Sequence, residues 1–183
     1  MSQKKYLFDS DCLITAKNTY YSPNFSALFW EWLIAGNMQN TFFMIDKVID
    51  ELKHENHEDD YLYQLADTHG DNFKLITTGQ DCLQKYGELQ NWANTTWAIG
   101  KNASQIRKAS EKFAREKSAD AWEIAYANIH DFVIVSNEEP APDSKTIIKL
   151  PDAAKAFNVK VVKLHEVLSL YSGQNFTFKF PSP

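Results

Sequence analysis

Short apolar runs alternate along the chain with stretches in which apolar residues recur at helical spacing. Continuous runs of this kind are typical of parallel strands that are buried on both faces. They lie at residues 6–8, 41–45, 132–135, 146–148 and 159–162. Residues 73–77 fit either a short strand or an extended linker, and residues 176–180 fit either an edge strand or a loose tail.

Apolar residues spaced three and four apart predict helices between these runs. The predicted helices start near residue 12 and continue with 25–35, 48–52, 62–70, 83–86, 92–117 with a break near Gly100, 119–128, 151–157 and 165–171. Gly36 and Asn37 are expected to end the second helix, while Asp11 and Ser118 are expected to cap helices. Strands that alternate with helices predict an α/β fold with three layers, in which helices cover both faces of a mostly parallel sheet.

Composition adds limits to this picture. At 183 residues the chain is most simply one domain, 1–183, with a core at about 5–163 followed by a C-terminal helix and tail. A net charge of −5 argues against a strongly cationic nucleic-acid coat protein, and two cysteines provide no disulfide framework. No signal peptide is evident, and no apolar stretch approaches the ~20 residues of a membrane helix, so we expect a cytoplasmic protein with no membrane partner.

Acidic residues follow the predicted strands and open the predicted helices. Asp9 and Asp11 follow the first strand, Glu51 lies in the third helix, Asp120 opens the helix at 119–128, and Glu138 follows the strand at 132–135. Because ligands of parallel sheets collect at the carboxyl ends of the strands, these acids can converge. Hard oxygen ligands suit Mg²⁺ or Mn²⁺. Any one of the acids taken alone is more simply a solvated side chain or a helix cap.

Four segments resemble, in the same order, the motifs of PIN-domain ribonucleases. YLFDSDCLI at 6–14 is similar to the opening strand and acid, VIDEL at 48–52 to the second motif, ADAWEIA at 119–125 to the third, and VIVSNE at 133–138 to the fourth. The resemblance covers about residues 5–163. Glu138 stands where Asp is commoner, Glu139 competes for that role, and the segment between Glu51 and Asp120 is longer than in minimal members. The chain thus resembles a divergent, toxin-type PIN-like subfamily.

The resemblance implies a metal-dependent endoribonuclease with one or two Mg²⁺ or Mn²⁺ ions. Its catalytic residues would be Asp9, Glu51, Asp120 and Glu138. Asp9 and Asp120 would bind metal directly, and Glu138, like Glu51, would bind through water or complete a second metal site. Ser136 would orient a neighbouring acid, and Asp11 would support Asp9. The substrate would be RNA, and the family role suggests a protein antitoxin and a homodimer as partners.

A basic segment leads into the third motif. Residues 101–117 contain six Lys and Arg against two Glu. The candidates for contacts to RNA phosphates are Arg107, Lys108, Lys112 and Arg115. A solvated helix with pairs such as Glu111–Arg115 explains the same charges without a ligand.

Two other functions stay open on the sequence alone. Asp9 and Asp11 at a strand end are similar to the nucleophile and acid of haloacid-dehalogenase-type phosphohydrolases, although no later Lys or Asp-Asp motif fits that family. A catalytically silent PIN-like module that binds RNA or protein is the alternative from another class; the acids that are present argue against it, and the Glu138 departure keeps it open.

Overall fold

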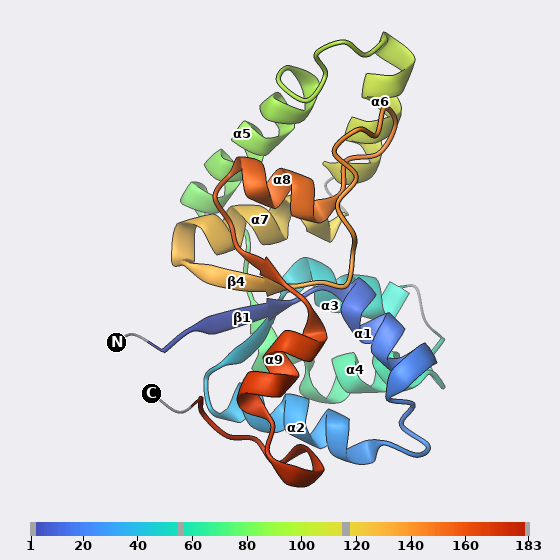
Figure 1. The fold of residues 1–183 in the computed structure, drawn as a ribbon, viewed down its shortest axis with the longest axis vertical. Helices are drawn as coiled ribbons and strands as arrows, with labels where there is room; N and C mark the ends of the chain where they lie inside the picture. The colour runs from blue at the N-terminus through green and yellow to red at the C-terminus, as the bar shows by residue number, and fades with distance from the viewer. Residues whose placement is uncertain (1–2, 55–56, 115–117, 182–183) are drawn as a thin grey trace.

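The computed structural model describes residues 3–54, 57–114 and 118–181. Its centre is a five-stranded sheet in which every pair of neighbouring strands is parallel, in the order β3-β2-β1-β4-β5. The strands are β1 (Lys5–Phe8), β2 (Phe42–Ile45), β3 (Lys74–Leu75), β4 (Phe132–Val135) and β5 (Val161–Val162). The predicted α/β class with a parallel sheet is therefore confirmed, and β1 is its central strand (Figure 1).

Helices connect the strands and cover both faces of the sheet (Figure 1). They are α1 (Ser10–Thr15), which continues into a π-helical turn (Ala16–Tyr20), α2 (Ala27–Met38), α3 (Asp46–His54), α4 (Tyr61–Phe73), α5 (Gln80–Asn94), α6 (Ala103–Phe113), α7 (Ala119–His130), α8 (Leu150–Ala156) and α9 (Leu164–Tyr171), followed by a 3₁₀ turn (Gln174–Phe176). Over the described ranges, none of them is long and apolar enough to cross a membrane.

Aromatic side chains join the helices to the two faces of the sheet. On one face the Phe8 ring packs edge-on against Trp32 of α2, with 6.4 Å between the ring centroids. The Trp32 indole in turn donates to the backbone oxygen of Tyr171 at the end of α9, at 3.0 Å. On the other face Phe132 packs against Tyr126 of α7 at 5.6 Å. Successive side chains of a strand point to opposite faces of the sheet, so the same strands contact both layers of helices.

Helices α5 and α6 form an arm that extends beyond α7 and α8 (Figure 1). The arm is fixed to the body through α5, which packs along α7. There the Tyr86 and Trp122 rings stack with their centroids 3.9 Å apart. The predicted break near Gly100 is present, because α5 ends at Asn94 and α6 begins at Ala103, with Gly100 in the left-handed region at a φ of 76°.

Two predictions of secondary structure were wrong. Residues 146–148 form a loop before α8, and Ile148 is buried there by packing alone rather than in a strand. Gly36 and Asn37 lie inside α2, which runs on to Met38. Gly36 is needed because any side chain there would overlap the Phe42 ring. Asn37 is buried and donates its amide to the Phe42 oxygen at 2.9 Å, so both residues serve packing.

Candidate acidic active site

Asp9 lies at the carboxyl end of the central strand and is buried, with 4% of its surface exposed. Ser136, at the end of the neighbouring β4, donates its hydroxyl to Asp9 Oδ2 at 2.9 Å. The Glu138 N–H donates to the same Ser136 oxygen at 3.2 Å. Asp9 occupies the N-cap position of α1, whereas Asp11, which was expected to cap this helix, lies in its first turn. The cap prediction was wrong by two residues because the helix begins directly at the strand end.

Glu51 connects three helices. Its Oε2 accepts the Ser10 hydroxyl of α1 at 2.9 Å, and its Oε1 accepts the first N–H of α7, that of Ala119, at 2.9 Å. Ser118 occupies the N-cap position of α7 as predicted, but its side chain makes no cap bond. The carboxylate of Glu51 therefore does what the cap residue was expected to do. A negative charge at this end of a helix is also favoured by the helix dipole.

Asp120 and Glu123 lie one turn apart on α7 and share a face of that helix. Glu123 is fully buried, with an exposed fraction of zero, which is rare for an acidic side chain. No described residue donates a hydrogen bond to either of its oxygens. The signal in the sequence was the apolar surroundings, which are all buried: Ala119, Ala121, Trp122, Ile124 and Ala125. A buried polar group without a partner is costly and calls for an explanation.

The charges of these acids act on one another. Burial raises the pKa of Asp9 to about 7, against the Ser136 hydrogen bond that lowers it. The charges of Asp11, Glu51 and Glu138 contribute to this rise. Acids that were distant in sequence are thus close enough to disfavour one another's ionisation.

The same holds for the two acids of α7. Burial raises the pKa of Asp120 well above its usual value, and the charges of Asp9, Glu138 and Glu51 add to the effect. Burial is also the main cause that raises the pKa of Glu123, and the charges of Asp9 and Asp120 add to this rise. Such a cluster of acids is stable only if protons or bound cations neutralise part of its negative charge.

Of the two candidates in the fourth motif, Glu138 is the one that faces the cluster. Its Oε1 pairs with Lys149 Nζ at 2.8 Å, and its Oε2 accepts the Leu150 N–H at 3.1 Å. Glu139 is 80% exposed and pairs with Lys163 at 2.8 Å. The charges that raise the pKa values of Asp9 and Asp120 include that of Glu138, and Glu139 is not among their causes.

In the part of the chain that is described, no three His, Cys, Asp or Glu side chains are placed so that they could hold one ion. Glu51 and Glu138 are turned toward donors of the protein itself. The remaining donors, on Asp9, Asp120 and Glu123, are all carboxylate oxygens. Their chemistry fits a hard divalent cation such as Mg²⁺ or Mn²⁺, and the unpartnered oxygens of Glu123 leave donors free for one.

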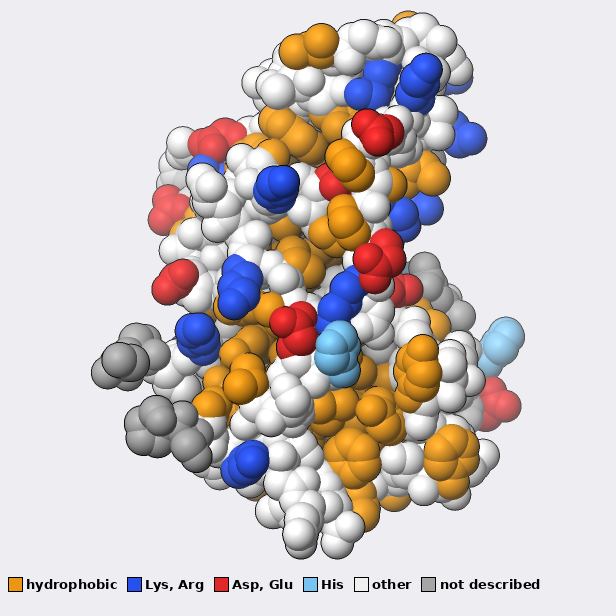
Figure 2. All heavy atoms as spheres, in the orientation of Figure 1, with side chains coloured by type: hydrophobic (Ala, Val, Ile, Leu, Met, Phe, Trp, Pro, Cys, Tyr) orange, Lys and Arg blue, Asp and Glu red, His pale blue; other side chains and the backbone are white. Residues whose placement is uncertain are grey.

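The predicted phosphate-binding residues lie on the arm, where Lys and Arg side chains gather (Figure 2). Arg107, Lys108 and Lys112 are exposed on α6, and Arg115 lies outside the described residues. The charge of Lys112 lowers the pKa of Asp120 against its burial. The basic side of α6 therefore extends toward the acids.

Comparison with known proteins gave one result that bears on identity. No curated protein and no solved structure matches the chain. A family model described as "Domain of unknown function (DUF4411)" matches residues 6–175, which include every acid of the cluster. The chain belongs to this family of domains of unknown function, DUF4411.

Proposed function

We propose that this protein is a metal-dependent endoribonuclease of PIN type that hydrolyses RNA phosphodiester bonds, in the role of a toxin controlled by a protein antitoxin. The fold class, the order of the four motifs and the position of the acids at the carboxyl ends of β1 and β4 support this proposal. Membership in the family gives no activity, so the proposal rests on the residues of the site.

One observation carries the proposal, namely the buried carboxylate of Glu123 beside Asp9 and Asp120. Neither oxygen of Glu123 receives a hydrogen bond from the described residues. A fold that needed this position only for packing would be more stable with an apolar side chain there. The charges of Asp9 and Asp120 raise the pKa of Glu123, and this crowding of acids is accounted for if a divalent cation neutralises the three carboxylates.

The protein's own residues would divide the work as follows. Asp9 and Asp120, with Glu123, would hold the cation, and Ser136 fixes one oxygen of Asp9 through its hydrogen bond. Glu51 anchors the start of α7 and so positions Asp120. When bound, Mg²⁺ or Mn²⁺ would activate water and stabilise charge on the phosphoryl oxygens. The exposed cations of α6 would bind the flanking RNA phosphates.

The experiment is a calorimetric titration of Mn²⁺ into the wild-type protein and into the double variant Asp9→Asn/Asp120→Asn, followed by cleavage assays on structured and single-stranded RNAs. The matched control is Asp81→Asn/Asp131→Asn, which removes two exposed acids instead. Asp131 caps the end of α7 directly before β4, away from the carboxyl end of that strand, and Asn tolerates its left-handed backbone. We expect Mn²⁺ binding and RNA cleavage in the wild type and the control, and neither in the double variant.

A catalytically silent RNA-binding module is the second candidate, and the contacts of Glu138 favour it. Its carboxylate is held by Lys149 and by the Leu150 N–H, so a cation of the protein already balances its charge. In that case the double variant would bind RNA as the wild type does, and no RNA would be cleaved in Mg²⁺ or Mn²⁺. Cleavage of a phosphomonoester in place of RNA would instead point to the phosphohydrolase alternative.

A further inference from the structure

A pocket of about 500 Å³ opens beside the acid cluster. Sites for small molecules typically have about 300–1,000 Å³. Asp11 lines the pocket and adds to the charges that raise the pKa of Asp9. Asn137 lines it as well, directly after Ser136, which donates to Asp9. The pocket therefore continues from the candidate active site along the carboxyl ends of β1, β4 and β5.

Aromatic rings form one side of this pocket. Tyr20 ends the π-helical turn and is 61% exposed. Its ring lies against Tyr21, with 6.3 Å between the centroids, and Tyr21 stacks on Phe29 at 4.4 Å. Phe29 is fully buried, so the exposed ring rests on a rigid aromatic base. Single turns of π-helix are frequent at functional sites, and exposed aromatics are the surfaces on which unpaired bases stack.

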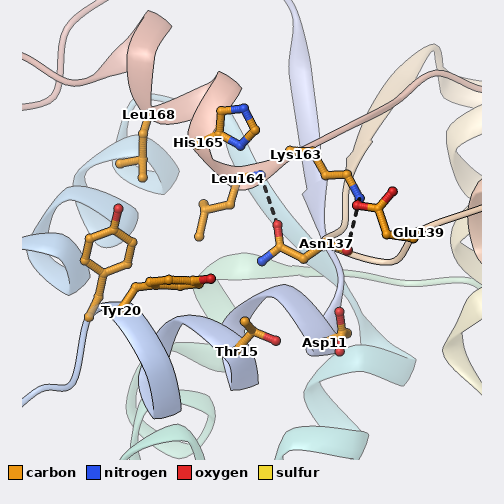
Figure 3. Close-up of a pocket in the computed structure, with 10 residues that line it drawn as sticks. Asp11, Thr15, Tyr20, Asn137, Glu139, Lys163, Leu164, His165 and Leu168 are labelled. Carbon is orange, nitrogen blue, oxygen red and sulfur yellow. Dashed lines mark hydrogen bonds and ion pairs between the residues drawn. The ribbon is translucent and has the colours of Figure 1, made fainter.

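An amide faces the aromatic side across the pocket. The Asn137 Oδ1 accepts the Leu164 N–H at 3.4 Å, which turns its Nδ2 into the pocket (Figure 3). Thr15 also lines this pocket (Figure 3). Side-chain amides and hydroxyls are the groups that read the edges of nucleobases.

The charges of the lining favour an uncharged ligand. Lys163 lines the pocket, but its charge is engaged by the loop after β4. Its Nζ donates to the backbone oxygens of Asn137 and Glu138 at 3.0 and 2.6 Å and pairs with the carboxylate of Glu139. Asp11 contributes a further acid. A phosphate would thus meet more negative than positive charge in the pocket, whereas a neutral base would not be repelled.

We propose that this pocket binds one unpaired nucleobase of a single-stranded RNA, with Tyr20 stacking on the base and Asn137 reading its edge. The proposal rests on the proposed function, because it places the adjoining phosphate at the acid cluster. It adds that the substrate is single-stranded at this position and that one base is selected.

The test is fluorescence anisotropy with labelled single-stranded RNA homopolymers of each base, in EDTA so that metal-dependent cleavage does not occur. We expect Tyr20→Ala to weaken binding about fivefold or more, since base stacking on one aromatic ring contributes at least this much. Tyr20→Phe should bind as the wild type does, because the ring is kept. Phe25→Ala, which removes an exposed ring outside the pocket, is the matched control.

Asn137→Asp supplies an independent readout. It keeps the acceptor for the Leu164 N–H but removes the amide donor, so the order of preference among the four homopolymers should change. RNA cleavage by the wild type together with unchanged affinities and preferences in Tyr20→Ala and Asn137→Asp would overturn the pocket assignment and leave the nuclease intact. A wild type that binds no homopolymer would overturn the pocket assignment too, and the absence of cleavage in Mn²⁺ would then overturn the nuclease separately.

Discussion

Asp9→Asn is expected to stabilise the metal-free protein above pH 7, although it should abolish activity. The substitution removes a buried charge that the neighbouring acids Glu51 and Glu138 oppose. The Asn oxygen can still accept the Ser136 hydroxyl that Asp9 Oδ2 accepts at 2.9 Å. The change therefore isolates the electrostatic cost of the acid from its hydrogen bond.

The magnitude follows from the pKa of Asp9, which burial raises from 3.8 to about 7. Well below pH 3.8 the acid is neutral in the folded and unfolded chains and costs nothing. Between pH 4 and pH 7 the unfolded chain loses its proton first, so the wild type loses stability as the pH rises. Three pKa units correspond to roughly 4 kcal/mol. Because the neighbouring acids are partly exposed, solvent screens their charges and lowers this energy. We expect Asp9→Asn to be more stable than the wild type by about 2 kcal/mol above pH 7, which corresponds to a Tm higher by about 4–8 °C.

The assay is urea unfolding of the wild type and of Asp9→Asn in EDTA at intervals from pH 4 to pH 8. The difference in the free energy of unfolding should be near zero at pH 4 and reach its plateau above pH 7. Asp131→Asn, at an exposed position, should show no such rise. A difference that does not depend on pH, or a less stable Asp9→Asn at pH 8, would refute the reasoning.

Three further changes test the hydrogen bond to Asp9, the proposed metal site and the packing of the helices. Ser136→Ala removes the donor to Asp9 and should cost about 1–3 kcal/mol in urea unfolding at pH 8 and less at pH 4, where the acid is neutral; equal losses at both pH values would contradict this. Mn²⁺ at a hundred times its Kd should raise the free energy of unfolding of the wild type by about 2.7 kcal/mol, and should not do so for Asp9→Asn/Asp120→Asn. Gly36→Ala should lose about 1–3 kcal/mol because the new methyl overlaps a buried ring, whereas Gly87→Ala, which has open space in α5, should gain up to about 1 kcal/mol.

Local patterns in the sequence predicted most of the strands of the sheet. The runs at 6–8, 41–45, 132–135 and 159–162 became strands of the parallel sheet because a continuous apolar run of this length is stable only when it is buried on both faces. The run at 146–148 failed, since its buried Ile148 is packed in a loop and burial does not require a strand partner. The positions of Asp9 and Ser136 at strand ends were also readable, because the ends of parallel strands meet at one edge.

Only the tertiary structure decided what the acids contact. Glu51 and Glu123 look alike in the sequence, as acids within helices, yet one accepts the first N–H of α7 and the other is buried without a donor. Likewise, Glu138 and Glu139 are neighbours in the chain, but Glu138 pairs with Lys149, whereas Glu139 is 80% exposed and pairs with Lys163. Spacing along the chain sets the face on which a side chain emerges. What that face meets depends on which elements pack against it, and the local sequence does not contain this information.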